Sequence, residues 1–318
     1  ALLRRRIRDP RFSMELYGVG RRSRSDVAIC YISDSVDQSV LNRMRKLIQS
    51  IDVDALTMNI ESLAECMFTH KWINPFPKFK YSERPDTATA AILDGNIVIM
   101  VDNSPAVMII PASIFDIIEE ADDFNFSPMI GSYLRITRFF FSIVTWILTP
   151  LWLLFVNNPD WVPEFMKFVL ITDDITVPVL LQLLILELAV DGLKLAAVNT
   201  PTMLSTPLSI VAGIVVGEYA VSSGWFNPEA LLYMAVVTVG TYGQTNFEMG
   251  YAFKFLRVLT LILTQIFNLG GFIAGVVISV LMIAFNRTIT GKSYIYPLIP
   301  WDGKMLKRKV LRVRLPHS

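Results

Sequence analysis

Residues 201–224 read PTMLSTPLSIVAGIVVGEYAVSSG and combine an apolar run with one ionisable side chain. Gly213 and Gly217 stand four residues apart, so on a helix they share one face and let a second backbone come close. Glu218 follows directly, and a carboxylate in hydrocarbon costs roughly 2.5–3.5 kcal/mol unless it faces a partner or water. The stretch fits two structures: a helix of an assembly that lines an ion path, or a core helix of a monomeric bundle with Glu218 hydrogen-bonded to a neighbour.

The apolar residues are concentrated in the second half of the chain. The 318 residues are 53% hydrophobic and only 18% charged, whereas typical soluble domains are about 25% charged. We therefore expect a cytoplasmic α+β domain at 1–130, an all-α polytopic transmembrane domain at 131–287, and a basic cytoplasmic tail at 288–318. The start lacks Met and a signal-peptide pattern. We take the α+β domain as the second of two, with an upstream part missing.

The first 130 residues alternate between strand and helix patterns. Short runs rich in β-branched and aromatic residues predict extended segments at 12–20, 26–33, 96–101 and 106–110. Apolar residues at helical spacing, or a proline at a helix start, predict helices at 34–51, 60–68, 85–93 and 114–122. Turns are expected at 21–24 and at Asp94-Gly95, and the proline-marked segment 74–84 is expected to be a loop.

Five apolar stretches follow, at 133–155, 178–198, 207–222, 231–249 and 258–285. About 20 apolar residues cross the hydrocarbon core of a bilayer. The last stretch is longer than that and is interrupted by Asn268-Leu269-Gly270-Gly271, so we expect a hairpin of two short helices. This gives six crossings, or four to five if 178–198 lies in the membrane plane or the last run does not turn. Arginines before the first crossing and an acidic loop after it place both termini in the cytoplasm.

Acidic residues outnumber basic ones between Phe139 and Phe253, and carboxylates beside a water path favour cations. Those in expected loops fit solvated surface charges. Glu187, Asp191 and Glu218 lie in expected membrane helices, which rarely keep such groups without a use. Asp191 could instead pair with Lys194, three residues further along. The candidate ion-path residues are Glu187, Asp191, Ser209, Gly213, Val216, Gly217 and Glu218.

No motif predicts catalysis, a cofactor or a metal site. The two cysteines and two histidines lack the spacing of zinc ligands, and the phosphate-loop, nucleophile-elbow and dinucleotide motifs are not present in the sequence. We therefore expect a protein that is not an enzyme. Residues 287–318 carry eight basic residues against one acidic residue, Asp302. This fits contact with anionic lipid at about 1 kcal/mol per basic residue, in preference to nucleic acid.

Several short motifs occur together in this chain: GVG at 18–20, RRS at 21–23, NPFP at 74–77, SERPD at 82–86, LDG at 93–95, VDNSP at 101–105, LRITR at 134–138, LSIV at 208–211 and YPLIP at 296–300. With them the chain resembles the A-subunit family of spore germinant receptors, the GerA family, over nearly its whole length. The resemblance implies a protein of the spore inner membrane that assembles as a ring, expected to be a pentamer. It further implies a cation channel that opens early in germination while partner subunits sense nutrients.

Two details bear on what the resemblance implies here. Glu218 stands where many members of the family carry Gln, so it would place a charged ring where others have a polar one. Arg84 and Asp86 are expected to pair, either within one subunit or as a contact between subunits. We expect a homo-oligomeric channel subunit for monovalent cations, acting downstream of or alongside nutrient receptors, with other germination proteins and anionic lipid as partners and no nucleic acid. The alternative is a non-conducting membrane scaffold that organises germination proteins, and a solute carrier ranks last because we find no internal repeat.

Overall fold

The computed structural model describes residues 2–67, 74–199, 213–289, 291 and 293–313. The chain divides into two compact units. One consists of Ala1–Arg135 together with Ile283–Ser318, and the other of Ile136–Met282. The first unit mixes strands with helices, and the second is helical. The predicted succession of an α+β region and a mostly helical region is thereby confirmed.

The first unit is built on a five-stranded sheet in the order β1-β2-β4-β5-β3. Every neighbouring pair is antiparallel, with Phe12 opposite Ile32, Val27 opposite Val101, and Ile97 opposite Ile110. The strands are β1 (Phe12–Val19), β2 (Ser25–Ile32), β3 (Lys80–Ser82), β4 (Ile97–Val101) and β5 (Val107–Ile110). Four of them were expected from the sequence. The third lies in the segment predicted to be a loop, because three residues are too few to show alternation.

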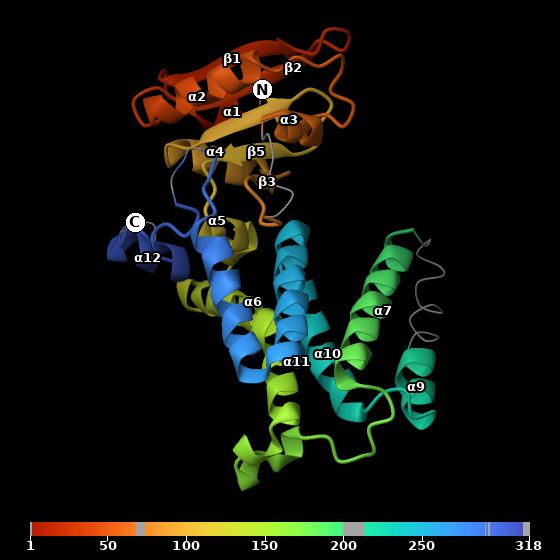
Figure 1. Cartoon of the computed structure of the whole chain (residues 1–318). Helices are drawn as coiled ribbons and strands as arrows, with labels where there is room; N and C mark the ends of the chain where they lie inside the picture. The colour runs from red at the N-terminus through yellow and green to blue at the C-terminus, as the bar shows by residue number, and fades with distance from the viewer. Residues whose placement is uncertain (1, 68–73, 200–212, 290, 292, 314–318) are drawn as a thin grey trace. The chain divides into compact units, whose positions relative to one another are not determined.

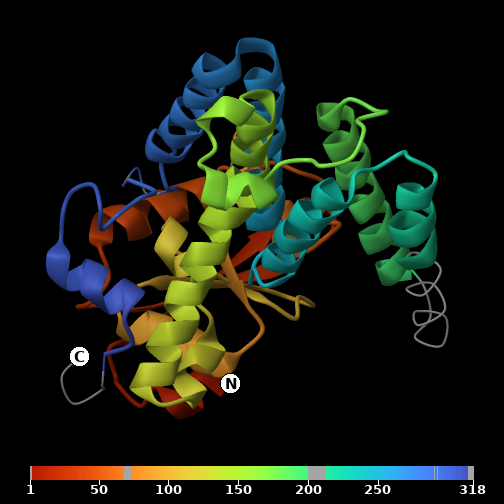
Figure 2. The same ribbon diagram turned by 90° about the horizontal axis from the view of Figure 1, so that it is seen from below.

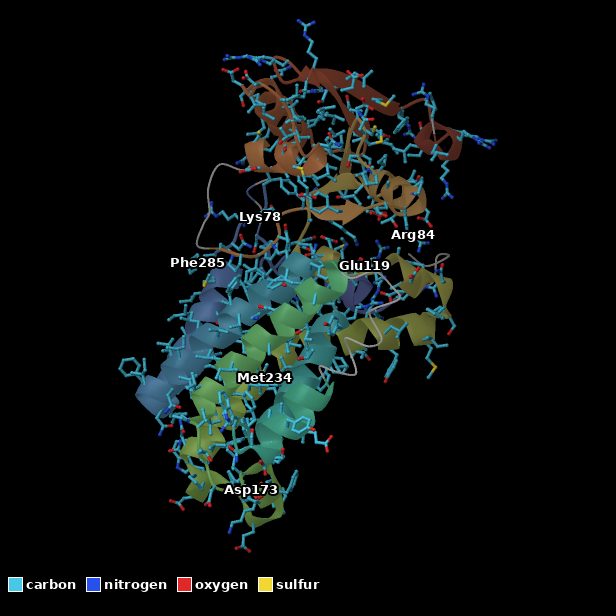
Figure 3. All side chains as sticks on the ribbon, turned by 90° about the vertical axis from the view of Figure 1, so that its right-hand side faces the viewer. Lys78, Arg84, Glu119, Asp173, Met234 and Phe285 are labelled. Carbon is cyan, nitrogen blue, oxygen red and sulfur yellow. The ribbon has the colours of Figure 1, made fainter. Side chains whose placement is uncertain are left out.

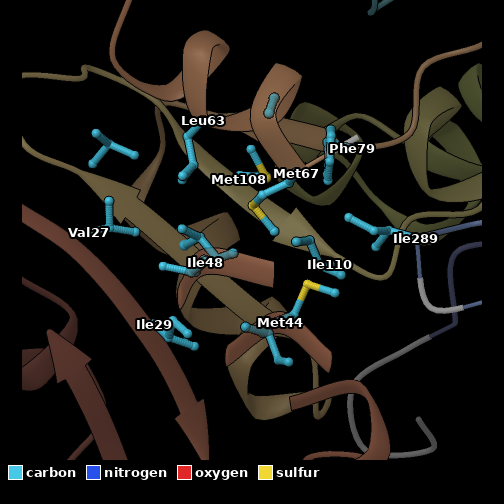
Figure 4. Close-up of a cluster of buried hydrophobic side chains, with 14 of the residues drawn as sticks. Val27, Ile29, Met44, Ile48, Leu63, Met67, Phe79, Met108, Ile110 and Ile289 are labelled. Atoms are coloured by element: carbon cyan, nitrogen blue, oxygen red, sulfur yellow. The ribbon is translucent and has the colours of Figure 1, made fainter. Parts of the chain in front are cut away.

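Helices cover both faces of this sheet, and alternation along β2 assigns the side chains to them. Val27 and Ile29 join the cluster under α2 (Gln38–Gln49) and α3 (Ile60–Met67), part of which Figure 4 shows. Ala28 and Cys30 join the cluster on the opposite face, under α1 (Leu2–Arg6) and α4 (Pro85–Leu93). The first unit is therefore a layer of sheet between two layers of helix.

The segment after the helical region returns to the first unit instead of forming a separate tail. Ile289 packs into the core cluster of the sheet (Figure 4), and the N–H of Ile114 donates to the carbonyl oxygen of Tyr294 at 3.0 Å. The returning segment contains α12 (Gly303–Val310), which lies against α5 (Ile114–Ile118). Arg312, just after α12, donates to the carbonyl oxygen of Phe124 in the 3₁₀ helix η1 (Ala121–Asn125) at 3.0 Å. The sequence suggests a free tail because 288–318 is basic on average, and the few residues that contact the first unit, such as Ile289 and Tyr294, do not stand out in that composition.

The helical region begins with α6 (Pro128–Asn157), whose first residues still belong to the first unit. After the short 3₁₀ helices η2 (Pro159–Trp161) and η3 (Glu164–Val169) come α7 (Val179–Asn199), η4 (Gly213–Tyr219), α9 (Ala220–Ser222), α10 (Pro228–Tyr242) and α11 (Phe247–Ala284). Met234 on α10, labelled in Figure 3, is buried in a cluster with Trp152, Leu183 and Leu261. Among the described residues, α6 and α11 are the helices long and apolar enough to cross a membrane. The predicted number of crossings stays a prediction.

The expected hairpin in the last apolar stretch is confirmed. At Asn268 the backbone of α11 leaves the helical conformation, with φ 52° and ψ −128°, and Figures 1 and 2 show two rods side by side. A Cβ atom added to Gly271 would lie 1.8 Å from the carbonyl oxygen of Leu263, and one added to Gly275 would lie 2.8 Å from Thr260. The two arms therefore meet through glycines at four-residue spacing, which allow the backbones to approach closely.

Candidate functional site

A network of charged side chains joins three helices of the second unit. Glu187 of α7 is 4% exposed and forms a bidentate pair with Arg257 of α11, with Nε–Oε1 at 2.5 Å and Nη2–Oε2 at 2.9 Å. The remaining Nη1 of Arg257 donates to the carbonyl oxygen of Thr145 on α6. A forked guanidinium suits this role because it supplies several donors in a fixed plane.

Lys254, one turn before Arg257 on α11, extends the network. Its Nζ lies 3.4 Å from Oε2 of Glu187, donates to the backbone oxygen of Glu187 at 3.0 Å, and pairs with Asp191. Lys194 lies instead over two aromatic rings, 5.2 Å from the centroid of Tyr242 and 5.5 Å from that of Tyr251. A cation held over aromatic faces is stabilised by their π electrons.

This arrangement changes the interpretation of the two carboxylates in α7. Glu187 and Asp191 do lie together, as their four-residue spacing predicts, but each faces a cation of α11 instead of an open path. Asp191 pairs with Lys254, and the alternative pairing with Lys194 considered from the sequence is not the contact that the structure gives. Two carboxylates and three cations surround a gap of about 10 Å³, lined in part by Asp191 and Lys194, so the cluster carries one positive charge in excess. The gap has room for about one water molecule.

The sequence did contain a signal for the partners of these carboxylates. Lys254 and Arg257 stand three residues apart, and Glu187 and Asp191 stand four apart, so each pair lies on one helix face. Read from the sequence alone, Lys254 and Arg257 instead indicate a return of the chain to the cytoplasm, because basic residues commonly mark that boundary of a membrane helix. The network could have been predicted by pairing the helix face that carries the two acids with the helix face that carries the two bases.

The other ion-path candidates lie in or before η4. Ser209 lies outside the described residues, and Val216 lies in η4, where its side chain is not described. Gly213–Tyr219 forms a wider, π-type helix, a form that is frequent at functional sites. Glu218 and Gly213 are exposed, and a Cβ atom added to Gly213 or Gly217 would meet no described atom within 4 Å. In one copy of the chain, the carboxylate is therefore exposed, and the described structure leaves open space beside both glycines.

Arg84 and Asp86 form a pair within one chain, at the start of α4. Nη2 of Arg84 lies 2.9 Å from the Asp86 carboxylate, and Nη1 lies 2.5 Å from Asp122 of η1. The hydrogen bond from Arg84 is the main reason that the pKa of Asp86 lies well below its ordinary value. Figure 3 labels Arg84 in the first unit. The contact of Arg84 with Asp122 ties the start of α4 to η1, and the use of Arg84 and Asp86 as a contact between subunits stays a prediction.

Comparison with known proteins places this chain among spore germination proteins. The family described as "Bacillus/Clostridium GerA spore germination protein" matches residues 1–318. Stage V sporulation protein AF of Bacillus subtilis (strain 168) is 37% identical over 318 residues, which is 100% of this chain and 64% of that protein. Spore germination protein GerLA of Bacillus cereus is 27% identical, with 100% and 64% covered.

One solved structure is also similar. It is the N-terminal domain of the A subunit of the Bacillus megaterium spore germinant receptor GerK3, 31% identical, with a TM-score of 0.27 over 34% of this chain and 84% of that chain. The present chain spans just under two thirds of the length of the two curated relatives above.

Proposed function

The chain belongs to the GerA family of spore germination proteins, and from this premise we propose that it is a subunit of an oligomeric membrane channel for monovalent cations. The channel acts in germination, downstream of or alongside nutrient receptors. Its membrane is the inner membrane of the spore, with the amino- and carboxyl-terminal regions in the cytoplasm. Its partners are further copies of itself, arranged as a pentamer, and other germination proteins of the same membrane.

The observation that carries the proposal is the exposure of Glu218 beside Gly213 in a single copy. An ionisable group in a membrane helix normally faces a partner or water. The open space at Gly213 and Gly217 suits the close approach of another helix. A ring of identical subunits provides both, because it covers the glycines and turns the Glu218 carboxylates towards a shared aqueous axis, where they favour cations.

The network of Glu187 supports a different part of the same proposal. Its carboxylates are paired within one subunit, so they hold α6, α7 and α11 together. Of the three carboxylates considered for the ion path, Glu218 is the exposed one. We therefore assign the selective role to Glu218 and a structural role to Glu187 and Asp191.

Conductance measurements on the full-length protein in planar bilayers test this assignment. The wild type should pass K⁺ and Na⁺ in preference to Cl⁻, and Glu218→Gln should lower the cation-to-anion permeability ratio by about threefold or more, because each subunit loses one charge at the axis. Glu164→Gln is the matched control. It removes a carboxylate that is 94% exposed and pairs with Lys167, so its permeability ratio should equal that of the wild type.

The alternative is a non-conducting scaffold that organises germination proteins. The Glu187 network favours the scaffold, because its ion pairs hold the helices of one copy together within that copy. An intact oligomer that stays electrically silent in the same bilayers would support the scaffold. A monomer with Glu218 enclosed in its own bundle would contradict both the channel and the ring.

A further inference from the structure

We propose that α12 and the residues just before it form a docking surface for anionic lipid, held in a fixed orientation beside the start of α6. We call this the α12 surface and define it by the exposed residues Leu298, Ile299, Trp301, Lys304, Lys307 and Arg308. It rests on the proposed function only in that α6 enters a membrane. Conduction by the protein is not required.

The chemistry of the α12 surface suits a charged membrane interface. Lys304, Lys307 and Arg308 are exposed at spacings of three and four residues, so they share one face of the helix. Trp301 is 71% exposed directly before the helix. Tryptophan favours the headgroup level of a bilayer, and basic residues beside it attract anionic headgroups.

The opposite side of α12 is fixed by charge pairs. Lys309 pairs with Asp116 of α5 and lies 3.8 Å from Glu119. Burial alone would lower the pKa of Lys309, but the charges of Asp116 and Glu119 outweigh it and the pKa is raised. Lys309 therefore faces α5 and pairs with its carboxylate. The exposed cations are Lys304, Lys307 and Arg308.

The start of α6 holds the same segment from a second direction. Arg135, only 2% exposed, donates from Nη1 to the carbonyl oxygens of Arg308 at 3.1 Å and Lys309 at 3.4 Å. Its Nη2 lies 2.5 Å from Glu119. The N–H of Arg312 donates to Oγ of Ser132 at 3.0 Å. The last turn of α12 and Arg312, which follows the helix, are thus both bonded to the start of α6.

These bonds hold the α12 surface beside the first turns of α6, within one unit of the chain. Anionic lipid is the ligand that the positive charge of this surface and Trp301 fit together, because tryptophan favours the headgroup level and basic residues attract anionic headgroups.

The test uses the full-length protein in lipid nanodiscs and quenching of tryptophan fluorescence by brominated lipid. The contribution of Trp301 is the difference between the wild type and Trp301→Phe. We expect brominated phosphatidylglycerol to quench this contribution about twofold more than brominated phosphatidylcholine at the same mole fraction, with the excess lost at high salt.

Charge removal then tests the role of the cations. Lys304→Gln/Lys307→Gln/Arg308→Gln should abolish the preference for the anionic lipid. The matched control, Arg5→Gln/Arg6→Gln/Arg8→Gln, removes three exposed cations from the same unit and should keep it. Equal quenching by both lipids, or a preference that survives the α12 triple change, overturns the proposal.

A nucleic-acid role is separated by a second readout. Binding of a labelled DNA duplex to detergent-solubilised protein that is lost in the α12 triple variant, together with no lipid preference in nanodiscs, would also overturn the proposal. Because quenching does not depend on conductance, a silent channel with a lipid preference contradicts the proposed function alone.

Discussion

At the scale of single residues, the second unit depends on a buried ion pair. Glu187 and Arg257 are 4% and 3% exposed. The Nη1 atom of the guanidinium also donates to a backbone oxygen, that of Thr145. Bringing both charges out of water is costly, and their attraction offsets that cost only while both are present. The pair is therefore a strong constraint on which helices meet, even if its net contribution to stability is small.

Removing one partner should accordingly destabilise the fold more than removing both. Glu187→Gln leaves Arg257 buried without its carboxylate, so we expect a loss of about 3–5 kcal/mol in the free energy of unfolding, measured by denaturant titration in micelles. The double change Glu187→Gln/Arg257→Gln should recover part of that loss. A single variant as stable as Glu164→Gln would show that the pair carries no such constraint.

A second residue-scale prediction concerns pH and the first unit. Glu15 accepts hydrogen bonds from Arg45, Tyr17 and Tyr31. The Arg45 bond contributes most, and burial opposes it without cancelling it, so the pKa of Glu15 falls from 4.5 to about 2. Because the pKa of Glu15 is lower in the folded state than in the unfolded state, lowering the pH protonates this carboxylate in the unfolded state first. The stability from Glu15 is complete above about pH 4.5 and is lost as the pH falls towards 2.

Glu15→Gln should remove this dependence, because the amide does not titrate. Between pH 5 and pH 2.5 the wild type should lose about 1–2 kcal/mol more than the variant, a range that allows for solvent screening of a partly exposed group. Hydrogen exchange of the β1 and β2 amides in the full chain measures this. Parallel losses in both proteins across that pH range would refute the assignment to Glu15.

At the scale of elements, local sequence was sufficient where one pattern dominated. The antiparallel strands, the helices over the sheet and the turn at Asn268 all follow from alternation, helical spacing or a polar and glycine interruption. Two elements differ from expectation. β3 pairs with β5 inside a proline-marked segment, and the helix at 114 ends at Ile118, before a separate 3₁₀ turn. Both are short, and their form depends on neighbours distant in the sequence.

The α11 hairpin offers a sharp element-scale test, because two adjacent glycines differ completely in their surroundings. A Cβ atom at Gly271 would lie 1.8 Å from the carbonyl oxygen of Leu263, whereas one at Gly270 meets no described atom within 4 Å. Gly271→Ala should therefore destabilise the protein by about 1–3 kcal/mol or more by forcing the arms apart. Gly270→Ala should be close to neutral. Thermal unfolding in detergent compares the two, and equal midpoints would contradict this packing of the arms.

At the scale of the whole molecule, the chain returns to where it began. Ile283–Ser318 forms one unit with the first 135 residues, through Ile289 in the sheet core and Lys309 against Asp116. From composition alone, a boundary is expected at 287, with the basic segment 288–318 by itself. Composition describes a segment's average character, and a few buried contacts are enough to decide where such a segment lies.

The sequence by itself determined the succession of an α+β region and an apolar helical region, the strands and helices of the first, the hairpin in the last apolar run and the membership of the GerA family. These features follow from the spacing of apolar residues, from glycine, proline and asparagine at the ends of elements, and from short motifs. Each of these signals can be read within a few neighbouring residues. Only the tertiary structure decided that Asp191 faces Lys254 and that Arg135 bonds the last turn of α12. Hydrogen-bond partners 63 and 173 residues apart are chosen by which helices pack together, and that choice minimises the cost of burying many groups at once.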